Sequence, residues 1–406
     1  MKRILFLILI VGSFSVTQAQ IVKFDSIDRE IKHAALPYYS YGKGLGLTSP
    51  DSIFQLNIRF RMQNRVSYNN FEGEDESIDA KIRRLRLRFD GFVGNPKFMY
   101  SIQLSFAPED VGELEDGGNI NIIRDAVVVY RPNKNWDFSF GQTKLPGNRQ
   151  RLNSSGALQL TDRSINNARF NIDRDFGLQV HNTNEFPDKF SYNFRGAVSM
   201  GEGRNWTDNK DTGLALTGKA EIYPLGAFKK TGAYFEGDLL REEKPKLMLS
   251  GSYSQNNQAQ RTRGQQGDLL FEPRTLRSFF GDLIFKYDGW AFMSAYMNRS
   301  TKNPITVNPD DTNDIRYVFV GEGMDFQGSY IFRNNYEIIG RYSTQWVDDE
   351  IQMFEPNTQQ FSLGLTKYFW EHAFKIQAEA TYETQDFYIS EDKENWYVRL
   401  QVEIGI

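Results

Sequence analysis

The sequence predicts an all-β protein, a transmembrane antiparallel β-barrel of about sixteen strands that follows a cleaved signal peptide. Segments in which apolar and polar residues alternate recur to the end of the chain, and the connections between them are alternately short and long. After the signal peptide, no run approaches the roughly 18 consecutive apolar residues that a spanning helix requires. Any membrane spans should therefore be strands.

The N-terminus has the form of a secretory signal peptide. Lys2 and Arg3 precede an apolar run from Ile4 to Val11, and small and polar residues follow as far as Ala19. A basic start, an apolar centre and a small residue at the end are the features that a signal peptidase requires. We therefore expect cleavage after Ala19.

The rest of the chain divides simply. Residues 1–19 are the signal peptide, residues 20–50 form an irregular arm, and residues 51–406 form the barrel. The arm either stays in the periplasm or reaches into the lumen. No second domain is expected.

Alternation with a period of two identifies the strands. It is clear from Phe54 to Gln63, and a second segment alternates apolar residues with Arg84, Arg86 and Arg88. The last segment keeps its parity to Ile406, as barrel closure would require. We expect strands near residues 54–62, 85–89, 98–106, 126–130, 136–140, 176–180, 190–198, 214–222, 246–255, 278–288, 289–299, 317–332, 335–346, 359–369, 373–383 and 394–406.

Connection lengths support a bacterial barrel, because such barrels have short periplasmic turns and long external loops. Short turns are expected at 94–96, 132–134, 288–289, 333–335 and 370–372. Long loops are expected at 69–80, 107–119, 144–172, 201–212, 255–277 and 300–316. The connection from Pro224 to Lys244 should be a periplasmic turn yet is long, so it contains either strand extensions or a small ordered insert.

The composition is polar for a membrane protein but compatible with a barrel. Charged residues make up 25% of the chain and the mean hydropathy is −0.55. A barrel strand, however, presents only alternate residues to lipid. There is no cysteine, so no disulfide holds an exported chain together. The formal net charge of −4 does not favour a general nucleic-acid binder.

A secreted β-sandwich or β-propeller would also alternate apolar and polar residues. Strands of about ten residues, the alternating loop lengths and aromatic residues near strand ends favour the membrane barrel. The aromatic residues that would form the interfacial girdles are Tyr100, Tyr130, Trp136, Tyr287, Trp290, Trp346, Tyr368 and Trp396.

Several motifs resemble the phosphate-selective porin O and P family. They are Arg83-Arg84-Leu85-Arg86-Leu87, Phe140-Gly141-Gln142-Thr143-Lys144-Leu145-Pro146 continuing to Ser155, Arg174-Asp175-Phe176-Gly177, Arg163-Ser164 and Phe235-Glu236-Gly237. The resemblance extends from about Gly42 to Ile406. It implies a sixteen-stranded barrel, usually a trimer, with a lumen lined by arginine and lysine and narrowed by inward-folded loops.

The same resemblance implies a constriction role for Lys144 and Arg163, in the region of the third loop. Gly147 and Gln150 stand where the family often has an aromatic residue and a glutamate, which changes the shape and charge of the narrowest point. Ser154 and Ser155 are expected to shape the loop. The phosphate in the family's description does not by itself identify this chain's solute.

Parity places six arginines in the lumen if the apolar residues face lipid: Arg59, Arg61, Arg65, Arg84, Arg86 and Arg88. Such a cationic stripe in a channel with low-dielectric walls would concentrate anions. Guanidinium groups also match phosphate and carboxylate with paired donors. The alternative is that these arginines pair with carboxylates such as Asp90, Asp125, Glu379 and Glu403 and stiffen the wall.

No catalytic, metal or cofactor site is expected. The only histidines are His33, His181 and His372, and the chain has no metalloprotease or phosphate-loop motif. His181 has the parity of a hydrated wall residue.

The residues and the resemblance together predict passive diffusion of small hydrophilic solutes across a bacterial outer membrane, with a preference for phosphate or other anions. The expected partners are small anions, outer-membrane lipid and lipopolysaccharide. The alternative is a non-porin outer-membrane barrel with a closed lumen, either structural or adhesin-like or similar to a lipase.

Overall fold

The computed structural model describes residues 38–40, 44–50, 53–111, 122–205 and 212–406. The chain separates into two compact units, Met1–Tyr38 and Tyr39–Ile406. The predicted signal peptide and most of the predicted arm lie outside the described residues. The second unit contains the barrel.

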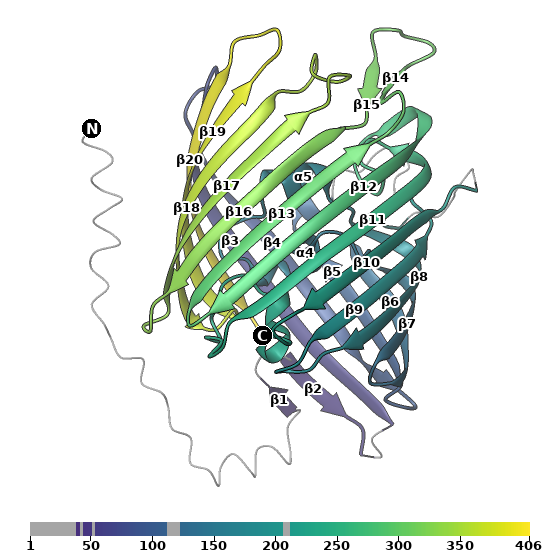
Figure 1. Cartoon of the computed structure of the whole chain (residues 1–406), viewed down its shortest axis with the longest axis vertical. Helices are drawn as coiled ribbons and strands as arrows, with labels where there is room; N and C mark the ends of the chain where they lie inside the picture. The colour runs from purple at the N-terminus through teal and green to yellow at the C-terminus, as the bar shows by residue number, and fades with distance from the viewer. Residues whose placement is uncertain (1–37, 41–43, 51–52, 112–121, 206–211) are drawn as a thin grey trace. The chain divides into compact units, whose positions relative to one another are not determined.

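Tyr39–Ile406 contains a closed antiparallel barrel of sixteen strands (Figure 1). Each strand pairs with its neighbour in sequence, and the last strand pairs with the first from Asn395↔Phe71 to Gly405↔Arg61, which closes the wall. The strands are β3 (Phe54–Phe71), β4 (Ser77–Val93), β5 (Phe98–Ser105), β6 (Ile123–Asn133), β7 (Trp136–Lys144), β8 (Arg174–Asn184), β9 (Ser191–Ser199), β10 (Ala215–Tyr223), β11 (Lys246–Arg261), β12 (Leu269–Tyr287), β13 (Trp290–Ser300), β16 (Gly321–Ile331), β17 (Tyr336–Val347), β18 (Asn357–Trp370), β19 (Phe374–Asp386) and β20 (Lys393–Gly405).

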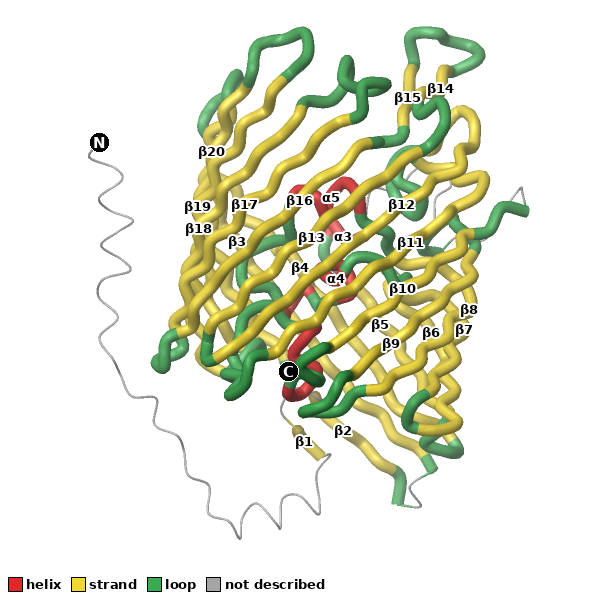
Figure 2. Tube along the Cα trace, in the orientation of Figure 1, coloured by secondary structure: helices red, strands yellow, loops and turns green. Residues whose placement is uncertain are grey.

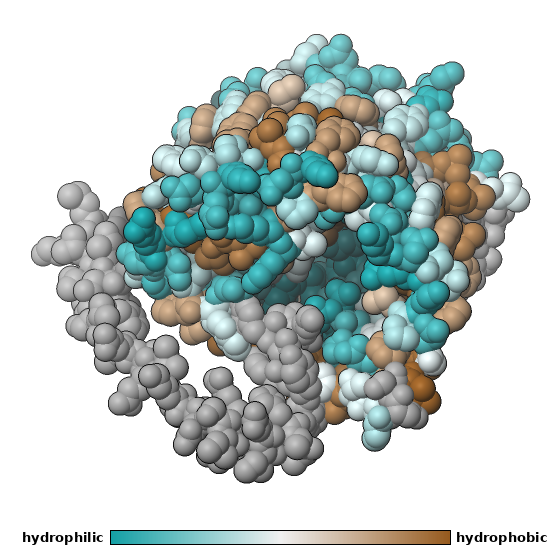
Figure 3. All heavy atoms as spheres, turned by 60° about the horizontal axis from the view of Figure 1, so that its bottom comes forward, coloured by the Kyte–Doolittle hydropathy of each residue, from teal (hydrophilic) through white to brown (hydrophobic). Residues whose placement is uncertain are grey.

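The predicted polarity of the wall is confirmed. Apolar side chains such as Phe140, Leu178 and Leu363 are exposed on the outer surface. The alternate residues, such as Lys219 and Glu221 of β10, are polar and buried in the interior. Figure 3, from the end that carries the short turns, shows hydrophilic residues around a hollow and hydrophobic residues on the outer side. This arrangement is the reverse of that in a soluble sheet protein, so the sandwich and propeller alternatives are excluded.

The strands on the long-loop side extend further than predicted. Residues 69–80 were expected to be a long loop, but β3 continues to Phe71 and β4 begins at Ser77. Within 255–277, β11 continues to Arg261 and β12 begins at Leu269. The expected loop 300–316 also contains a hairpin of β14 (Ile305–Val307) and β15 (Ile315–Tyr317). Beyond the hydrocarbon neither strand face needs to be apolar, so alternation gives no signal there.

Two segments fold into the barrel. The connection between β7 and β8 carries α4 (Arg149–Leu152), a 3₁₀ turn η1 (Ser155–Ala157) and α5 (Ile165–Phe170), and Figure 2 shows α4 and α5 inside the ring of strands. We call residues 145–173 the inner loop. The long connection between β10 and β11 contains a small ordered insert with the 3₁₀ turn η2 (Lys229–Tyr234), one of the two options predicted.

Each inward segment packs on the wall through an apolar cluster. Leu145, Phe170 and Ile172 of the inner loop are buried with Phe280 and Met297 of the wall. The insert contributes Phe228 and Ala233 to a second cluster with β11, β12 and β13. Apolar contact therefore fixes both segments as structured parts of the interior.

Part of the predicted arm lies in the wall. β2 (Gly44–Thr48) pairs antiparallel with the start of β3, from Leu45↔Ile58 to Thr48↔Gln55. A further short strand, β1 (Tyr38–Ser40), pairs with β2. Among the described residues, no helix has both the length and the apolar character needed to cross a membrane.

The outward direction of the apolar face can be tested with a charge on the middle of a strand. Leu363 of β18 is 69% exposed, and the substitution Leu363→Arg should destabilise the folded barrel by about 2–4 kcal/mol, because an arginine near the bilayer midplane must leave water. Denaturant unfolding in lipid vesicles measures the change. Ile389, in the loop between β19 and β20, is also 69% exposed, and Ile389→Arg is the matched control. Equal stability of the two variants would contradict a lipid-facing Leu363.

Candidate pore constriction

The inner loop is held against one side of the barrel by side chains of the wall. Lys375 Nζ donates to Gly156 O at 2.9 Å, and Gln377 Nε2 donates to Gln159 O at 2.7 Å and to Leu160 O at 3.0 Å. These donors satisfy carbonyls that have no helix or sheet partner. The loop therefore packs mainly on the side of the lumen formed by β12, β13 and β16–β20, with further contacts to β3, β4 and β10, and the open space beside it lies towards β5–β9.

Further wall donors fix the ends of the loop segments. Arg299 of β13 donates to Phe170 O at 2.8 Å and Asn171 O at 3.0 Å, at the end of α5. Arg341 of β17 donates to Asp162 O at 3.0 Å. Each contact places a buried cation on backbone carbonyls, so the wall determines the path of the loop.

Two cavities remain beside the loop. The outer cavity, about 510 Å³, lies towards the long loops, and the inner cavity, about 410 Å³, lies towards the short turns. Four arginines line both cavities: Arg86, Arg124, Arg151 and Arg163. We call these four residues the arginine neck, because they mark the place where the two cavities meet.

Both cavities have an excess of cationic side chains. The outer cavity is lined by nine arginines and four carboxylates, and the inner cavity by nine arginine or lysine residues and two carboxylates. The excess persists although many of the cations are paired. An anion in either cavity would therefore encounter a positive field.

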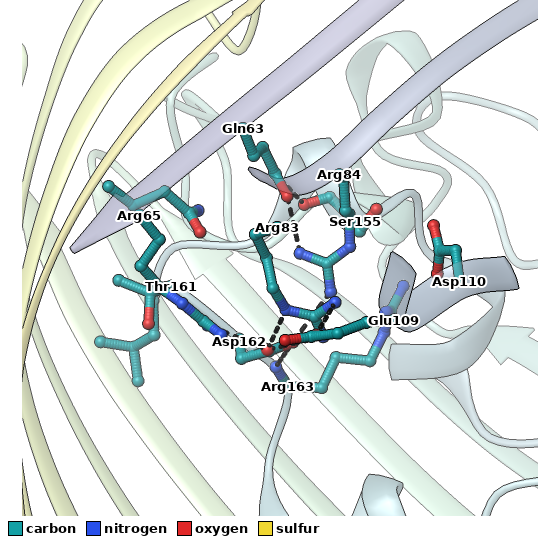
Figure 4. A network of polar contacts seen from close by, with 12 residues as sticks. Gln63, Arg65, Arg83, Arg84, Glu109, Asp110, Ser155, Thr161, Asp162 and Arg163 are labelled. Carbon is teal, nitrogen blue, oxygen red and sulfur yellow. Dashed lines mark hydrogen bonds and ion pairs between the residues drawn. The ribbon is translucent and has the colours of Figure 1, made fainter. Parts of the chain in front are cut away.

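Asp162 of the inner loop gathers three of the arginines (Figure 4). Its carboxylate oxygens lie 3.2 Å from Arg65 Nη1, 2.8 Å from Arg83 Nε and 2.9 Å from Arg84 Nη2. Burial alone would raise the pKa of Asp162, but Arg83, Arg84 and Arg65 lower it well below its usual value. One carboxylate thus organises three guanidinium groups and offsets only part of their positive charge.

At the neck, Asp110 likewise binds more than one arginine. It lies in α3 (Pro108–Val111), and its carboxylate accepts from Arg86 Nε at 2.9 Å, Arg124 Nη1 at 2.8 Å and Ser105 Oγ at 2.7 Å. Burial would raise the pKa of Asp110, yet Arg86 and Arg124 lower it overall. Two arginines of the neck therefore share one negative charge.

Lys144 and Arg163 are cations held by backbone carbonyls. Lys144 Nζ donates to Leu152 O at 2.7 Å and Asn153 O at 2.9 Å, and Arg163 donates to Gln150 O at 2.7 Å. Neither forms an ion pair with a carboxylate among the residues that the structure describes. Burial, together with the neighbouring charges of Arg151 and Arg84, lowers the pKa of Arg163 well below its usual value. Backbone carbonyls thus take the place of a carboxylate at these two cations.

The structure separates the eight residues predicted for the lumen into two groups. Those that line a cavity are Arg84, Arg86, Arg88, Lys144 and Arg163. The other three lie elsewhere in the interior. Arg59 pairs with Asp90, Arg65 pairs with Asp162, and Arg61 donates to Ser154 Oγ at 3.0 Å beneath the inner loop.

Of the carboxylates considered as partners of the six arginines, Asp90 pairs with Arg59 and Arg88, and Glu403 lies 3.7 Å from Arg61 Nε, whereas Asp125 and Glu379 pair with other cations. Asp125 accepts from Arg174 Nε at 2.9 Å, and Glu403 lies 3.5 Å from Lys375 Nζ. Arg341 lies 3.9 Å from Glu379. The interior therefore contains a wall network beneath and beside the loop as well as cations that face the cavities.

Nine arginines that line the cavities were not among the predicted lumen residues, and three of them, Arg83, Arg124 and Arg151, lie beside Asp162 or in the arginine neck. Arg83 and Arg124 lie at register irregularities, where Gln63↔Arg84 is followed by Asn64↔Ile82 and Gln103↔Asp125 by Leu104↔Ile123. A bulge of this kind turns two consecutive residues to one face, which breaks the parity rule. Arg151 lies on the inner loop, whose path has no periodic signal. The doublets Arg83-Arg84 and Arg124-Asp125 were the available hint.

Ser154 and Ser155 shape the loop and also line the inner cavity. Ser154 Oγ accepts from Gly156 N at 3.2 Å and so caps η1. Ser155 Oγ accepts from Arg86 Nη1 at 2.9 Å. No group of three or more residues that could hold a metal ion occurs among the described residues.

A closed barrel with an apolar outer face, short turns at one end and charged cavities inside is the architecture of a porin of the bacterial outer membrane. The sequence profile of the phosphate-selective porin O and P family matches residues 55–266. The chain belongs to this family, whose members are channels and not enzymes.

Solved structures support the fold. The outer-membrane channel DcaP of Acinetobacter baumannii is 14% identical, with a TM-score of 0.53, and the alignment covers 89% of this chain and 99% of that one. Salmonella typhi OmpF, solved with daunomycin, is 11% identical, with a TM-score of 0.54 and coverage of 88% and 100%. Among curated proteins, none matches the sequence significantly.

The contacts between wall and loop can be tested at Gln377. Gln377→Leu removes one donor from each of three buried loop carbonyls and, among the described residues, leaves Leu160 O without a side-chain donor, so we expect the inner loop to loosen and single-channel current to become noisier. Limited proteolysis should also cut within 145–173 sooner. Gln345→Leu is the matched control, because Gln345 is a buried lumen glutamine whose Nε2 meets no acceptor in the described part of the chain. If both variants behave like the parent, the wall donors do not hold the loop.

Proposed function

We propose that the protein is a passive diffusion pore for small hydrophilic solutes that prefers anions, phosphate among them. The observation that carries the proposal is the arginine neck, because a solute that passes from one cavity to the other must pass these four guanidinium groups. The proposed anion contacts are Arg84, Arg86, Arg88, Lys144 and Arg163, together with Arg124 and Arg151.

The physical basis is the focusing of charge in a narrow, low-dielectric passage. Lining cations raise the local concentration of anions, and planar guanidinium groups can each donate two hydrogen bonds to phosphate or carboxylate. Conduction also requires that no single site hold the ion too firmly. A neck in which Asp110 shares its charge between Arg86 and Arg124 meets this requirement better than four bare cations would.

A barrel with a closed lumen is the competing function. The inner loop and the insert fill much of the interior, but two cavities that share a lining favour a continuous path. Liposome swelling separates the two functions, because a porin admits small sugars and a plugged barrel admits none.

Anion preference can be measured in a planar bilayer under a KCl gradient. We expect a reversal potential that indicates anion preference, and we expect Arg84→Glu combined with Arg86→Glu to lower or invert it, because the change removes two positive charges and adds two negative charges at and above the neck. Lys134→Glu combined with Arg333→Glu makes the same charge change in short turns outside both cavities and should have little effect. A cation-leaning potential in the parent, or no response to the first pair, would refute the proposal.

We also infer that three chains assemble, as the sequence resemblance implies. The supporting feature is an apolar depression of about 1020 Å³ on the outer surface of β5–β11, lined by residues such as Phe98, Phe138 and Leu178. The remaining outer surface would face lipid and lipopolysaccharide. Native mass spectrometry of detergent-extracted protein should give the mass of three chains, and Leu178→Asp should reduce that species. A stable monomer in the parent would refute trimer formation.

A further inference from the structure

The outer cavity has two chemically different ends. The end next to the neck is rich in arginine, with Arg83 and Arg84 of β4 around Asp162. The end towards the long loops has amide and carboxylate groups on β18–β20, and Arg263 of the β11–β12 loop also lines the cavity. Gln360 of β18, Glu383 of β19 and Asn395 of β20 all line the cavity there.

These three residues form one row across the wall. Gln360 is the register partner of Glu383, and Glu383 is the register partner of Asn395. Gln360 Nε2 donates to Glu383 Oε2 at 2.9 Å, which fixes the two side chains against each other. We call Gln360, Glu383 and Asn395 the polar row.

Glu383 is an unexpected residue for a site that would accept only inorganic anions. It forms no ion pair with a cation among the described residues, and its two oxygens accept from the amides of Gln360 and Gln385, each at 2.9 Å. A carboxylate without a cationic partner repels phosphate. It is, however, a strong acceptor for hydroxyl groups.

Arg399 lies between the polar row and the neck. It is four residues beyond Asn395 on the same strand and faces the same cavity. Its guanidinium stacks on the ring of Tyr397, 3.7 Å from the centroid, and forms no ion pair with a carboxylate in the described part of the chain. The stacking holds a planar cation in place for an anionic group.

The size of the cavity also favours an organic solute. About 510 Å³ lies within the range of roughly 300–1,000 Å³ typical of small-molecule sites. Inorganic phosphate, with five heavy atoms, would leave most of this space to water. A solute that uses both ends needs an anionic group and several hydroxyl groups.

From this arrangement we propose that the outer cavity is an entry site for a small polyhydroxylated anion, a sugar phosphate or a sugar acid. Arg399 and the arginines near the neck take the anionic group, and the polar row takes the hydroxyl groups. The proposal rests on the anion preference proposed above and adds the class of solute. It makes Gln360, Glu383 and Asn395 specificity-determining residues.

The test measures block of single-channel current by solute added on the long-loop side. The probes are glucose 6-phosphate, glucuronate, inorganic phosphate and glucose. We expect the half-blocking concentration of glucose 6-phosphate or glucuronate to be about tenfold lower than those of phosphate and glucose, as two additional hydrogen bonds would give. Block by only one of the two sugar anions supports the proposal and identifies which anionic group the site takes.

Two variants assign the effect to the polar row. Gln360→Leu with Asn395→Leu should abolish the tenfold difference and leave the block by phosphate unchanged, because no charge is altered. Gln385→Leu is the matched control: it removes the same kind of bond to Glu383 from a residue that does not line the cavity, and the difference should persist.

The outcomes separate this inference from the proposed function. Equal block of the parent by glucose 6-phosphate, glucuronate and phosphate overturns the inference but leaves anion preference intact. A difference that survives in the double variant also overturns it. A reversal potential without anion preference refutes the proposed function, and the inference falls with it.

Discussion

An irregular chain segment at membrane depth is tolerated only where protein or water inside the barrel satisfies its backbone hydrogen bonds, because hydrocarbon offers no partner. The inner loop meets this requirement inside the barrel. Gln377 donates to Leu158 O, Gln159 O and Leu160 O, while Thr366 Oγ1 also donates to Gln159 O at 2.7 Å. The polar parity of the strands thus serves two purposes. On the open side of the lumen the inward polar side chains contact water. On the side that the loop covers, they take the place of water as hydrogen-bond partners of the loop backbone.

The same requirement explains the division of charge in the interior. Beneath the loop, carboxylates work as acceptors for the loop itself: Glu379 accepts from Thr161 N at 2.8 Å, and Glu236 of the insert accepts from Gln159 N at 3.0 Å. Carboxylates used in this way are not available to neutralise cations on the open side. There, Lys144 and Arg163 take backbone carbonyls as partners and form no ion pair with a carboxylate among the described residues. The same distribution of carboxylate and cationic side chains therefore both supports the loop and leaves the cavities cationic.

The sequence predicted those parts of the structure in which apolar and polar residues alternate along a regular strand. Arg84, Arg86 and Arg88 could be placed in the lumen because β4 is regular there, whereas Arg83 and Arg124 face inward only through bulges that parity does not encode. Arg151 was missed because the path of the inner loop depends on contacts with residues far away in sequence. Lys144 and Arg163 were predicted from the family resemblance alone. Strands that extend beyond the membrane were read as loops, because water on both faces leaves no alternation.

The insert between β10 and β11 shows why the neck can have a defined size. Glu236 accepts from Gln150 Nε2 at 3.2 Å, and its own backbone N–H donates to Ala157 O at 3.0 Å, so the insert contacts the loop both before η1 and at its last residue. Lys286 of β12 in turn donates to Gly232 O at 2.8 Å and Phe235 O at 3.0 Å and ties the insert to the wall. The loop is thus supported from the wall and from the short-turn end. Arg151 and Arg163 follow Gln150 within the same loop, so support at Gln150 restricts the movement of two members of the arginine neck. A pore that discriminates among anions by paired guanidinium donors needs this restriction, because the advantage of planar donors is lost when the spacing between them varies.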